Sequence, residues 1–244
     1  MRTALITGAS RGIGHGIALV LAARGYGLTI TSRTAEALEG VRDELLAAGA
    51  VRVIAPAADM ADRPALPGLV EAHRDEFGSM HALIVNAGVG TAGNISSFDM
   101  TRFDKTLEVN LASAMVLIQN SIPLLRRAAQ DDPVRGAKII GLSSITGAYA
   151  ERGLAVYGAS KAALLSLLET VNLEESRNGI TATALAPAYV DTDLSAWVTD
   201  RVPADSMIPV SDVVQLVATL LELTSNTVIS RIVMARKATN GYCA

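Results

Sequence analysis

Tyr157 and Lys161 stand four residues apart, and their side chains can do proton chemistry together. At this spacing they lie on one face of a helix, one turn from each other. A free phenol has a pKa near ~10, and an ammonium group close by favours the phenolate and so lowers that pKa. The pair could therefore take up and release a proton at a bound substrate. Lysine and tyrosine meet at this spacing on many helices, so the pair alone is weak support.

A second pattern is glycine-rich and lies between a short apolar run and a stretch with helical periodicity. It reads Thr7-Gly8-Ala9-Ser10-Arg11-Gly12-Ile13-Gly14. The three glycines permit a tight turn and let backbone N–H groups approach a pyrophosphate at the positive end of the following helix. On the glycines alone, a turn that binds nothing is an equally good explanation.

Short β-branched runs alternate with longer helical runs along the chain, which is typical of parallel strands joined by crossover helices. We expect strands at Thr3–Thr7, Gly27–Thr31, Val51–Ala55, His81–Asn86, Lys138–Ser143, Thr181–Leu185 and Thr227–Met234. We expect helices at Ile13–Ala23, Ala35–Ala48, Pro64–Phe77, Met100–Arg127, Val156–Arg177 and Ser211–Leu223. Pro123 should kink the fourth helix or end it near Ile122. The sequence predicts one α/β domain over residues 1–244, a Rossmann-type doubly wound parallel sheet of about seven strands with helices on both faces.

The glycine spacing resembles the short-chain dehydrogenase/reductase family, classical subtype, and this resemblance implies further residues at set places. The chain has each of them in order: Asp59-Met60 after the third strand, Asn86-Ala87-Gly88 after the fourth, Asn110 within the fourth helix, Ser144 after the fifth strand, and Tyr157 with Lys161. The resemblance extends from Thr3 to about Val233. Each element stands at a strand end or helix start, where a doubly wound sheet has its ligand crevice.

The resemblance implies a role for each catalytic candidate. Tyr157 gives a proton to a substrate carbonyl oxygen as hydride arrives, or removes it in the reverse reaction. Lys161 lowers the pKa of that phenol and binds the nicotinamide ribose. Ser144 holds the substrate oxygen; it has the family spacing to Tyr157, whereas its neighbour Ser143 does not. Asn110 anchors a water between Lys161 and solvent, with the alternative that it only bends or caps its helix.

Cofactor choice depends on the end of the second strand, where an acidic residue would bind the ribose 2′-hydroxyl of NAD. The chain has Ser32 there, followed by Arg33, and Arg11 lies in the glycine loop. Two guanidinium groups could clamp a 2′-phosphate, so we expect NADP(H) to be preferred over NAD(H). The alternative is that both arginines are solvated surface residues.

The segment after the sixth strand departs from the family, which has Pro-Gly and then a threonine there. The chain has Pro187, Ala188 and Thr192. If the second position needs a positive φ, alanine costs about 1 kcal/mol. The Val190 backbone and Thr192 would still meet the nicotinamide carboxamide. Residues 231–237 also replace the Gly-Gly ending that is frequent in the family.

Composition argues against several other classes of protein. The net charge is −3 and no stretch is strongly basic, so we expect no nucleic-acid partner. The single cysteine, Cys243, and three histidines without ligand spacing predict no metal site. No apolar run has the length of a signal core or a bilayer span, so we expect a cytoplasmic protein with no membrane partner.

The partners are expected to be a small carbonyl or alcohol substrate and further copies of the chain. The resemblance implies a homodimer or homotetramer formed through the fourth and fifth long helices, with Met115, Leu164 and Leu168 facing outward. Residues 189–209 and 148–154 should cover the substrate.

Three alternative functions stay open. The first is a carrier-linked 3-ketoacyl reductase, with Arg126, Arg127 and Arg177 as possible docking cations. The second is a catalytically silent nucleotide-sensing protein, against which the catalytic set argues. The third is a sugar-nucleotide epimerase, for which the chain is expected to be too short.

Overall fold

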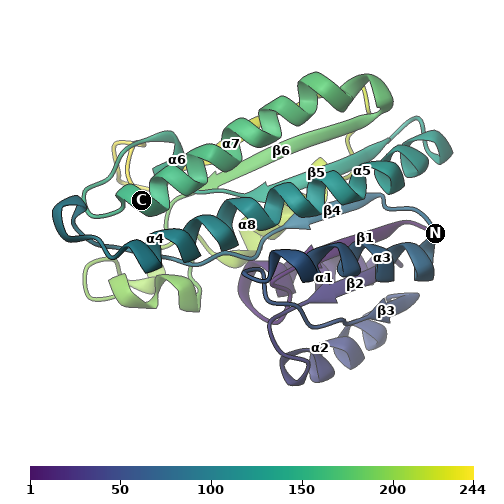
Figure 1. The fold of residues 1–244 in the computed structure, drawn as a ribbon, viewed down its shortest axis with the longest axis horizontal. Coiled ribbons are helices and arrows are strands. Elements are labelled where there is room, and N and C mark those ends of the chain that lie inside the picture. Colours follow the sequence, from purple (N-terminus) through teal and green to yellow (C-terminus); the bar gives the residue numbers. More distant parts are fainter.

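In the computed structural model, which describes all 244 residues, seven strands form one sheet in the order β3-β2-β1-β4-β5-β6-β7 (Figure 1). The strands are β1 (Thr3–Thr7), β2 (Gly27–Thr31), β3 (Arg52–Ile54), β4 (Ala82–Val85), β5 (Ala137–Leu142), β6 (Ile180–Pro187) and β7 (Arg231–Met234). All neighbours pair in parallel. The order reverses between β1 and β4, so the loops after these two strands open a crevice at the carboxyl edge of the sheet. The predicted fold class is confirmed.

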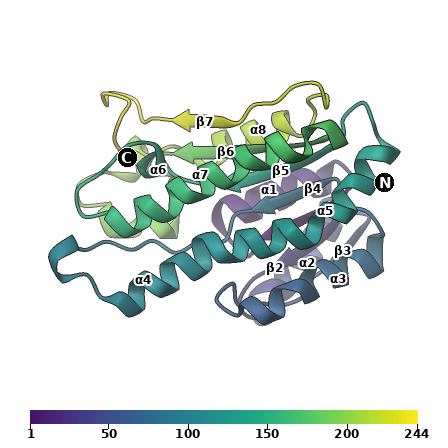
Figure 2. The same cartoon turned by 45° about the horizontal axis from the view of Figure 1, so that its top comes forward.

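Helices cover both faces of the sheet (Figures 1 and 2). One face carries α1 (Gly12–Ala23), α2 (Glu36–Ala47) and α8 (Val210–Leu220), and the other carries α3 (Leu66–Phe77), α5 (Ser113–Asp131) and α7 (Ala155–Glu175). Two shorter helices, α4 (Met100–Leu107) and α6 (Ile145–Ala148), lie toward the carboxyl edge. The five inner strands are buried along their whole length because both faces are covered. None of the helices is both long and apolar enough to cross a membrane.

The fourth predicted helix differs most from expectation. A π-helical segment, Glu108–Ala112, separates α4 from α5, where the sequence predicted one uninterrupted helix. The helix does not end near Ile122, one of the two outcomes predicted for Pro123, since α5 continues through this residue to Asp131. Pro123 lies on the exposed side, so water can hydrate the Gln119 carbonyl that loses its partner. Packing of the opposite side on the sheet holds the helix together.

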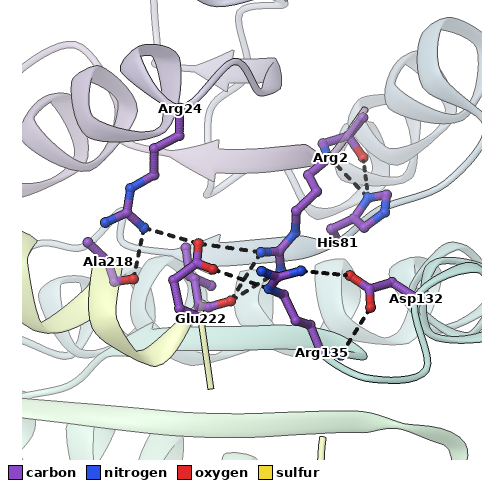
Figure 3. Close-up of polar contacts among 9 residues, drawn as sticks. Arg2, Arg24, His81, Asp132, Arg135, Ala218 and Glu222 are labelled. Atoms are coloured by element: carbon purple, nitrogen blue, oxygen red, sulfur yellow. Dashed lines mark hydrogen bonds and ion pairs between the residues drawn. The ribbon is translucent and has the colours of Figure 1, made fainter. Parts of the chain in front are cut away.

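At the amino edge of the sheet, opposite the carboxyl edge that opens the crevice, charged side chains form a network (Figure 3). Arg2, Arg24 and Arg135 all approach the carboxylate of Glu222, at 3.6, 3.3 and 3.2 Å. Arg135 also pairs with Asp132. Arg2 and Arg24 donate hydrogen bonds to the last carbonyl groups around the end of α8, which have no partner within the helix. The network fastens α8 to the start of β1 and the end of α1.

Candidate active site

The turn between β1 and α1 leaves the helix start open to a ligand. Gly8 has a φ of +66°, and a Cβ on Gly14 would collide with the carbonyl oxygen of Gly8. Arg11 precedes the helix, but no side chain caps it and its first turn has no acidic residue. The first N–H groups of α1 therefore have no side-chain partner, which is what phosphate binding at a helix start requires. The turn fits the pyrophosphate of a dinucleotide.

The loop after β4 is fastened to this turn. The Asn86 side-chain amide donates to the carbonyl oxygens of Thr7 and Gly8, at 2.9 and 3.0 Å. The backbone N–H groups of Asn86 and Ala87 donate to the Thr7 hydroxyl, each at 3.0 Å. Asn86 thus shapes the nucleotide turn.

Beside the turn lies a cavity of about 130 Å³ at the carboxyl edge of the sheet. Nine of the predicted residues line it: Ile13, Asn86, Gly88, Ser144, Tyr157, Lys161, Pro187, Val190 and Thr192. The other predicted residues do not: Gly8, Ser10, Arg11, Gly12, Gly14, Ser32, Arg33, Asp59, Met60, Ala87 and Asn110. The structure therefore brings Ser144, Tyr157 and Lys161 together with the residues expected around the nicotinamide. It leaves Asn110 and the pyrophosphate and adenosine candidates outside the cavity.

The Tyr157 side chain is half-buried beside the cavity, and loss of hydration around its phenol dominates its acidity. Burial raises its pKa to about 12, a hydrogen bond with Ser144 lowers it, and the nearby Tyr189 phenol raises it. The expectation that Lys161 makes the phenol more acidic is not met in the protein alone. The ammonium nitrogen lies 5.7 Å from the phenol ring centre, while loss of hydration acts on the whole phenolate charge.

Lys161 is buried without a carboxylate partner. Its ammonium group donates to the backbone carbonyl of Leu142 at 2.6 Å, and burial lowers its pKa to about 8. At neutral pH the group still carries its proton, because the pH is below that pKa. A Cβ on Gly88 would lie only 3.3 Å from the Lys161 nitrogen, so the glycine leaves room for the ammonium group.

Two adjacent serines have different partners. The Ser143 hydroxyl donates to the Lys161 carbonyl at 2.9 Å, which ties it to α7. The Ser144 oxygen accepts from the N–H and the hydroxyl of Thr146, at 3.2 and 3.0 Å. Its own hydroxyl proton can be donated to the Tyr157 phenol oxygen or to an acceptor bound in the cavity.

Asn110 lies in the π-helical segment and is buried. Its side-chain oxygen accepts from Val89 N–H at 2.8 Å, and its amide group donates to the Val89 carbonyl and to Ser160, each at 3.1 Å. The side chain therefore holds the loop after β4 against α7. The second lone pair of the side-chain oxygen is available to the water expected between Asn110 and Lys161.

The cofactor-choice residues lie around the ends of β1 and β2. Ser32 donates to the Thr34 carbonyl at 2.9 Å, and Arg33 is exposed and forms no ion pair. Arg11 pairs with Asp193 at 2.6 Å, with both side chains about 70% exposed. Arg11 is thus in contact with the segment expected to cover the substrate.

After β3, Asp59 is exposed and accepts from the Ala61 N–H at 2.9 Å. The Met60 side chain packs into the core below α3 and α5, so Met60 could meet a ligand only through its backbone. Ala188 does not have a positive φ, and its N–H donates to the Met234 carbonyl at 2.8 Å. The replacement of glycine there therefore causes no backbone strain.

The sequence pattern of short chain dehydrogenases matches residues 2–202 of the chain. The chain belongs to the short-chain dehydrogenase family. It is therefore an oxidoreductase that acts on CH–OH or C=O groups.

Known relatives agree with this assignment. A 3-oxoacyl-(acyl-carrier-protein) reductase of Staphylococcus aureus is 33% identical over 201 residues, which are 82% of this chain and 79% of the relative. The crystal structure of a 3-oxoacyl-(acyl-carrier protein) reductase from Brucella melitensis in complex with NAD has a TM-score of 0.86 and 28% identity, over 96% of this chain and 94% of that one. An alcohol dehydrogenase from Thermococcus sibiricus, complexed with 5-hydroxy-NADP, has a TM-score of 0.87 over 98% and 97% of the chains; at 24% identity it supports the fold alone.

One expectation for this short-chain dehydrogenase is corrected by burial. Leu164 and Leu168 do not face outward; they are 1% and 0% exposed and pack on the sheet. A Cβ on Gly141 in β5 would collide with Leu168, so this glycine makes room for the helix. Met115 on α5 is exposed, as predicted. The helical period therefore predicted the exposed face of α5 correctly. It predicted the wrong exposed face for α7, because this helix is apolar around much of its circumference.

Proposed function

We propose that this short-chain dehydrogenase transfers a hydride between NADP(H) and a small carbonyl compound or alcohol, with Tyr157 as the general acid and base. The supporting observation is that Tyr157, Ser144 and Lys161 line one cavity beside the uncapped start of α1. The nicotinamide supplies or accepts the hydride when it is bound. The protein has to hold the substrate oxygen and move a proton to or from it.

Tyr157 is in the right protonation state for reduction. With a pKa of about 12 it keeps its proton at neutral pH and can pass it to a carbonyl oxygen that gains negative charge. The Ser144 hydroxyl can turn its proton to the same oxygen and stabilise that charge. The reverse reaction needs the phenolate, which the positive charges of Lys161 and of an oxidised nicotinamide would favour.

Lys161 serves two groups in this proposal. The Leu142 carbonyl fixes its position, and its two remaining N–H bonds can reach the ribose hydroxyls of the nucleotide. Its charge then stabilises the phenolate left by proton donation. Asn110 supports this arrangement by joining the loop after β4 to α7.

The NADP(H) preference rests on charge at the end of β2. Ser32 stands where an acidic residue would bind the 2′-hydroxyl of NAD. Arg33 is exposed and forms no ion pair, so its guanidinium can meet a 2′-phosphate. Arg11 would have to share its guanidinium with Asp193. Measuring kcat/KM with NADPH and NADH tests the preference, and a higher value with NADH would end it.

The remaining nucleotide contacts follow the course of the crevice. Gly8, Ser10, Gly12 and Gly14 surround the helix start, where the pyrophosphate would bind. Asp59 and Met60 would meet the adenine through their backbone, and Pro187, Val190 and Thr192 border the nicotinamide end of the cavity.

We also propose that residues 1–244 work as one domain, because a single sheet extends from β1 to β7. Association into a homodimer or homotetramer is supported by the exposed Met115 on α5. A single cysteine agrees with the cytoplasm as the proposed location.

A carrier-linked 3-ketoacyl reductase is the second candidate, and the name of the Staphylococcus aureus relative favours it. Of the predicted docking cations, Arg126 is held by Glu175 through two hydrogen bonds. Arg127 and Arg177 are exposed and free of ion pairs. A 3-ketoacyl thioester on a carrier protein, compared with the same acyl group on a small thiol, separates the two candidates.

The test of the proposed function is NADPH consumption with a panel of carbonyl compounds, using the wild type and Tyr157→Phe. The variant should turn over about 10²- to 10⁴-fold more slowly and still bind NADPH. Unchanged turnover in Tyr157→Phe would refute the proton-transfer role. NADPH binding by the wild type without turnover of any compound would favour the nucleotide-sensing alternative.

A further inference from the structure

The chain after β7 returns to the candidate active site. The Met234 carbonyl at the end of β7 accepts from Ala188, so residues 235–244 start beside the segment that borders the cavity. Figures 1 and 2 both show the C-terminus close to α6, the helix that begins after Ser144. We call residues 235–244 the tail.

Hydrogen bonds within the tail hold it in a defined conformation. The Thr239 hydroxyl donates to the Arg236 carbonyl at 2.9 Å, and the Tyr242 N–H donates to the Asn240 side chain at 3.0 Å. Ala238 has a φ of +60°, and it is the one residue other than glycine with a positive φ in the chain. A residue with a Cβ is held in this region only where surrounding contacts demand it.

Contacts at Ala244 and at Tyr242 fix the end of the tail. The Ala244 N–H donates to the carboxylate of Glu151 at 3.2 Å, and the Ala244 carbonyl accepts from Arg236 at 2.9 Å. The Tyr242 ring meets Tyr149 edge to face, with ring centres 4.9 Å apart. Glu151 and Tyr149 belong to the loop that leads into α7, so the tail is attached to the segment just before Tyr157.

The tail also meets the segment after β6. The Arg236 guanidinium stands 6.0 Å from the centre of the Tyr189 ring, and Tyr189 packs edge to face on Trp197 at 6.2 Å. Ala244, Tyr189 and Trp197 line the same cavity as Tyr157. Ala244 is 9% exposed and packs with the apolar core of that face.

We propose that the tail is the wall that limits the length of the substrate. Glu151 and Arg236 are positioning residues that hold Ala244 in the cavity. This inference rests on the proposed function, since it assigns a substrate size to the same site. The cavity has about 130 Å³ in all, and the nicotinamide would take the end bordered by Pro187, Val190 and Thr192, so the substrate has only the remainder, which Ala244 borders. Short carbonyl compounds fit with the tail docked, and long acyl chains require its displacement.

The test measures kcat/KM with NADPH for a series of straight-chain methyl ketones from butanone to decanone. The ratio of decanone to butanone should rise at least about tenfold in Glu151→Ala and in Tyr242→Ala, the discrimination that one or two methylene groups produce in an apolar pocket. Glu151→Gln keeps an oxygen that can accept from Ala244 and should restore the wild-type ratio. Lys237→Ala removes an exposed tail side chain without contacts and is the control.

A binding measurement keeps this proposal separate from the proposed function. Trp197 is the only tryptophan, so its fluorescence can follow decanone binding in the absence of turnover. Tighter decanone binding by Glu151→Ala and Tyr242→Ala, together with wild-type binding by Lys237→Ala, supports the wall even if no ketone is reduced. Equal affinity and equal ratios in all these folded variants would overturn it. If Glu151→Ala does not fold, Tyr242→Ala alone decides, because its exposed ring can be removed without opening the core.

Discussion

The two edges of the sheet each bury a lysine in a strongly dehydrated position, and the two differ in what surrounds them. Burial lowers the pKa of both Lys138 and Lys161 to about 8. At the amino edge, Lys138 donates to the Thr181 hydroxyl and to the Thr224 carbonyl, at 3.1 and 3.2 Å. At the carboxyl edge, Lys161 has one acceptor, the Leu142 carbonyl.

The surroundings extend this difference. Arg2, Arg24 and Arg135 share Glu222 at the amino edge, so the charges there are paired within the protein (Figure 3). At the carboxyl edge the buried ammonium group of Lys161 and the half-buried phenol of Tyr157 face a cavity that no aspartate or glutamate side chain lines. Buried polar groups without full partners cost stability. We infer that the amino edge stabilises the fold and that the carboxyl edge is completed by its ligands.

Apart from changes at Tyr157 and Lys161 themselves, the largest effect is expected from Ser144→Ala, which removes a hydroxyl that faces the cavity. Turnover should fall about 10²- to 10³-fold, as for other donors to a developing oxyanion. Stability should fall by about 1 kcal/mol, because the Thr146 N–H at the start of α6 loses its acceptor. Ser143→Ala is the matched control, because that hydroxyl is already bound to the Lys161 carbonyl. It should lower stability by about 1 kcal/mol and change turnover far less. Equal kinetic losses in both variants would contradict the assignment.

The next effect concerns acid stability on the amino-edge side. His73 is fully buried between Thr29 and the Ser79 carbonyl, and burial lowers its pKa to about 4. The neutral ring is favoured in the folded state, so its contribution is complete above the unfolded pKa of about 6.5 and is lost as the pH falls toward 4. For this single group the free energy of unfolding should drop by about 2 kcal/mol between about pH 7.5 and pH 5.

Urea unfolding of the wild type and of His73→Gln at both pH values measures this drop in the free energy of unfolding. The drop should be smaller in the variant by about the same 2 kcal/mol, whereas NADPH affinity at neutral pH should not change. An identical acid dependence in the two proteins would show that His73 does not carry the effect.

A moderate effect is expected at the nucleotide end of the crevice. Arg33→Ala removes the exposed guanidinium expected at the 2′-phosphate, and such a charged hydrogen bond contributes about 1.5–3 kcal/mol. The ratio of kcat/KM for NADPH to that for NADH should therefore fall about tenfold or more. Arg42→Ala, an exposed arginine on α2, is the control and should keep the ratio.

The smallest effect is expected at the amino-edge network. Glu222→Ala leaves three arginines without their shared partner, but the carboxylate is 43% exposed and solvent screens the interaction. We expect a loss of about 1 kcal/mol, or about 2–4 °C in Tm, with turnover at room temperature unchanged. Asp75→Ala, at an exposed pair of sequence neighbours, should leave Tm unaltered. A large loss of turnover in Glu222→Ala would break the division between the two edges.

Much of the fold could be predicted because local signals agree with the tertiary structure. β1 and β2 lie at the predicted residues, since each is a β-branched run that ends at a glycine or polar turn. The break at Glu108–Ala112 was missed because this stretch contains no glycine or proline to mark the end of a helix. Pro123 was misjudged since its cost depends on whether the freed carbonyl faces water, which only the packed structure shows.

The residues that form the candidate site could largely be predicted from the sequence, whereas the pKa of Tyr157 could not. Nine predicted residues share one cavity, because strand ends at one edge of a parallel sheet converge. The raised pKa of Tyr157 could not be foreseen from a lysine one turn away, since burial has no sequence signal at this position. The approach of Ala244 to the cavity and the Arg11–Asp193 pair join segments far apart in the chain, and no local pattern marks them.

The most direct test of the central claim compares Lys161→Met with Lys138→Met in one experiment, by NADPH-dependent turnover and by Tm. The account predicts that Lys161→Met loses about 10²-fold or more in turnover without a lower Tm, because an uncompensated buried charge is removed. It predicts that Lys138→Met keeps turnover within about threefold of the wild type, since its contacts are all at the opposite edge. Retained turnover in Lys161→Met, or an equal loss in Lys138→Met, would contradict it.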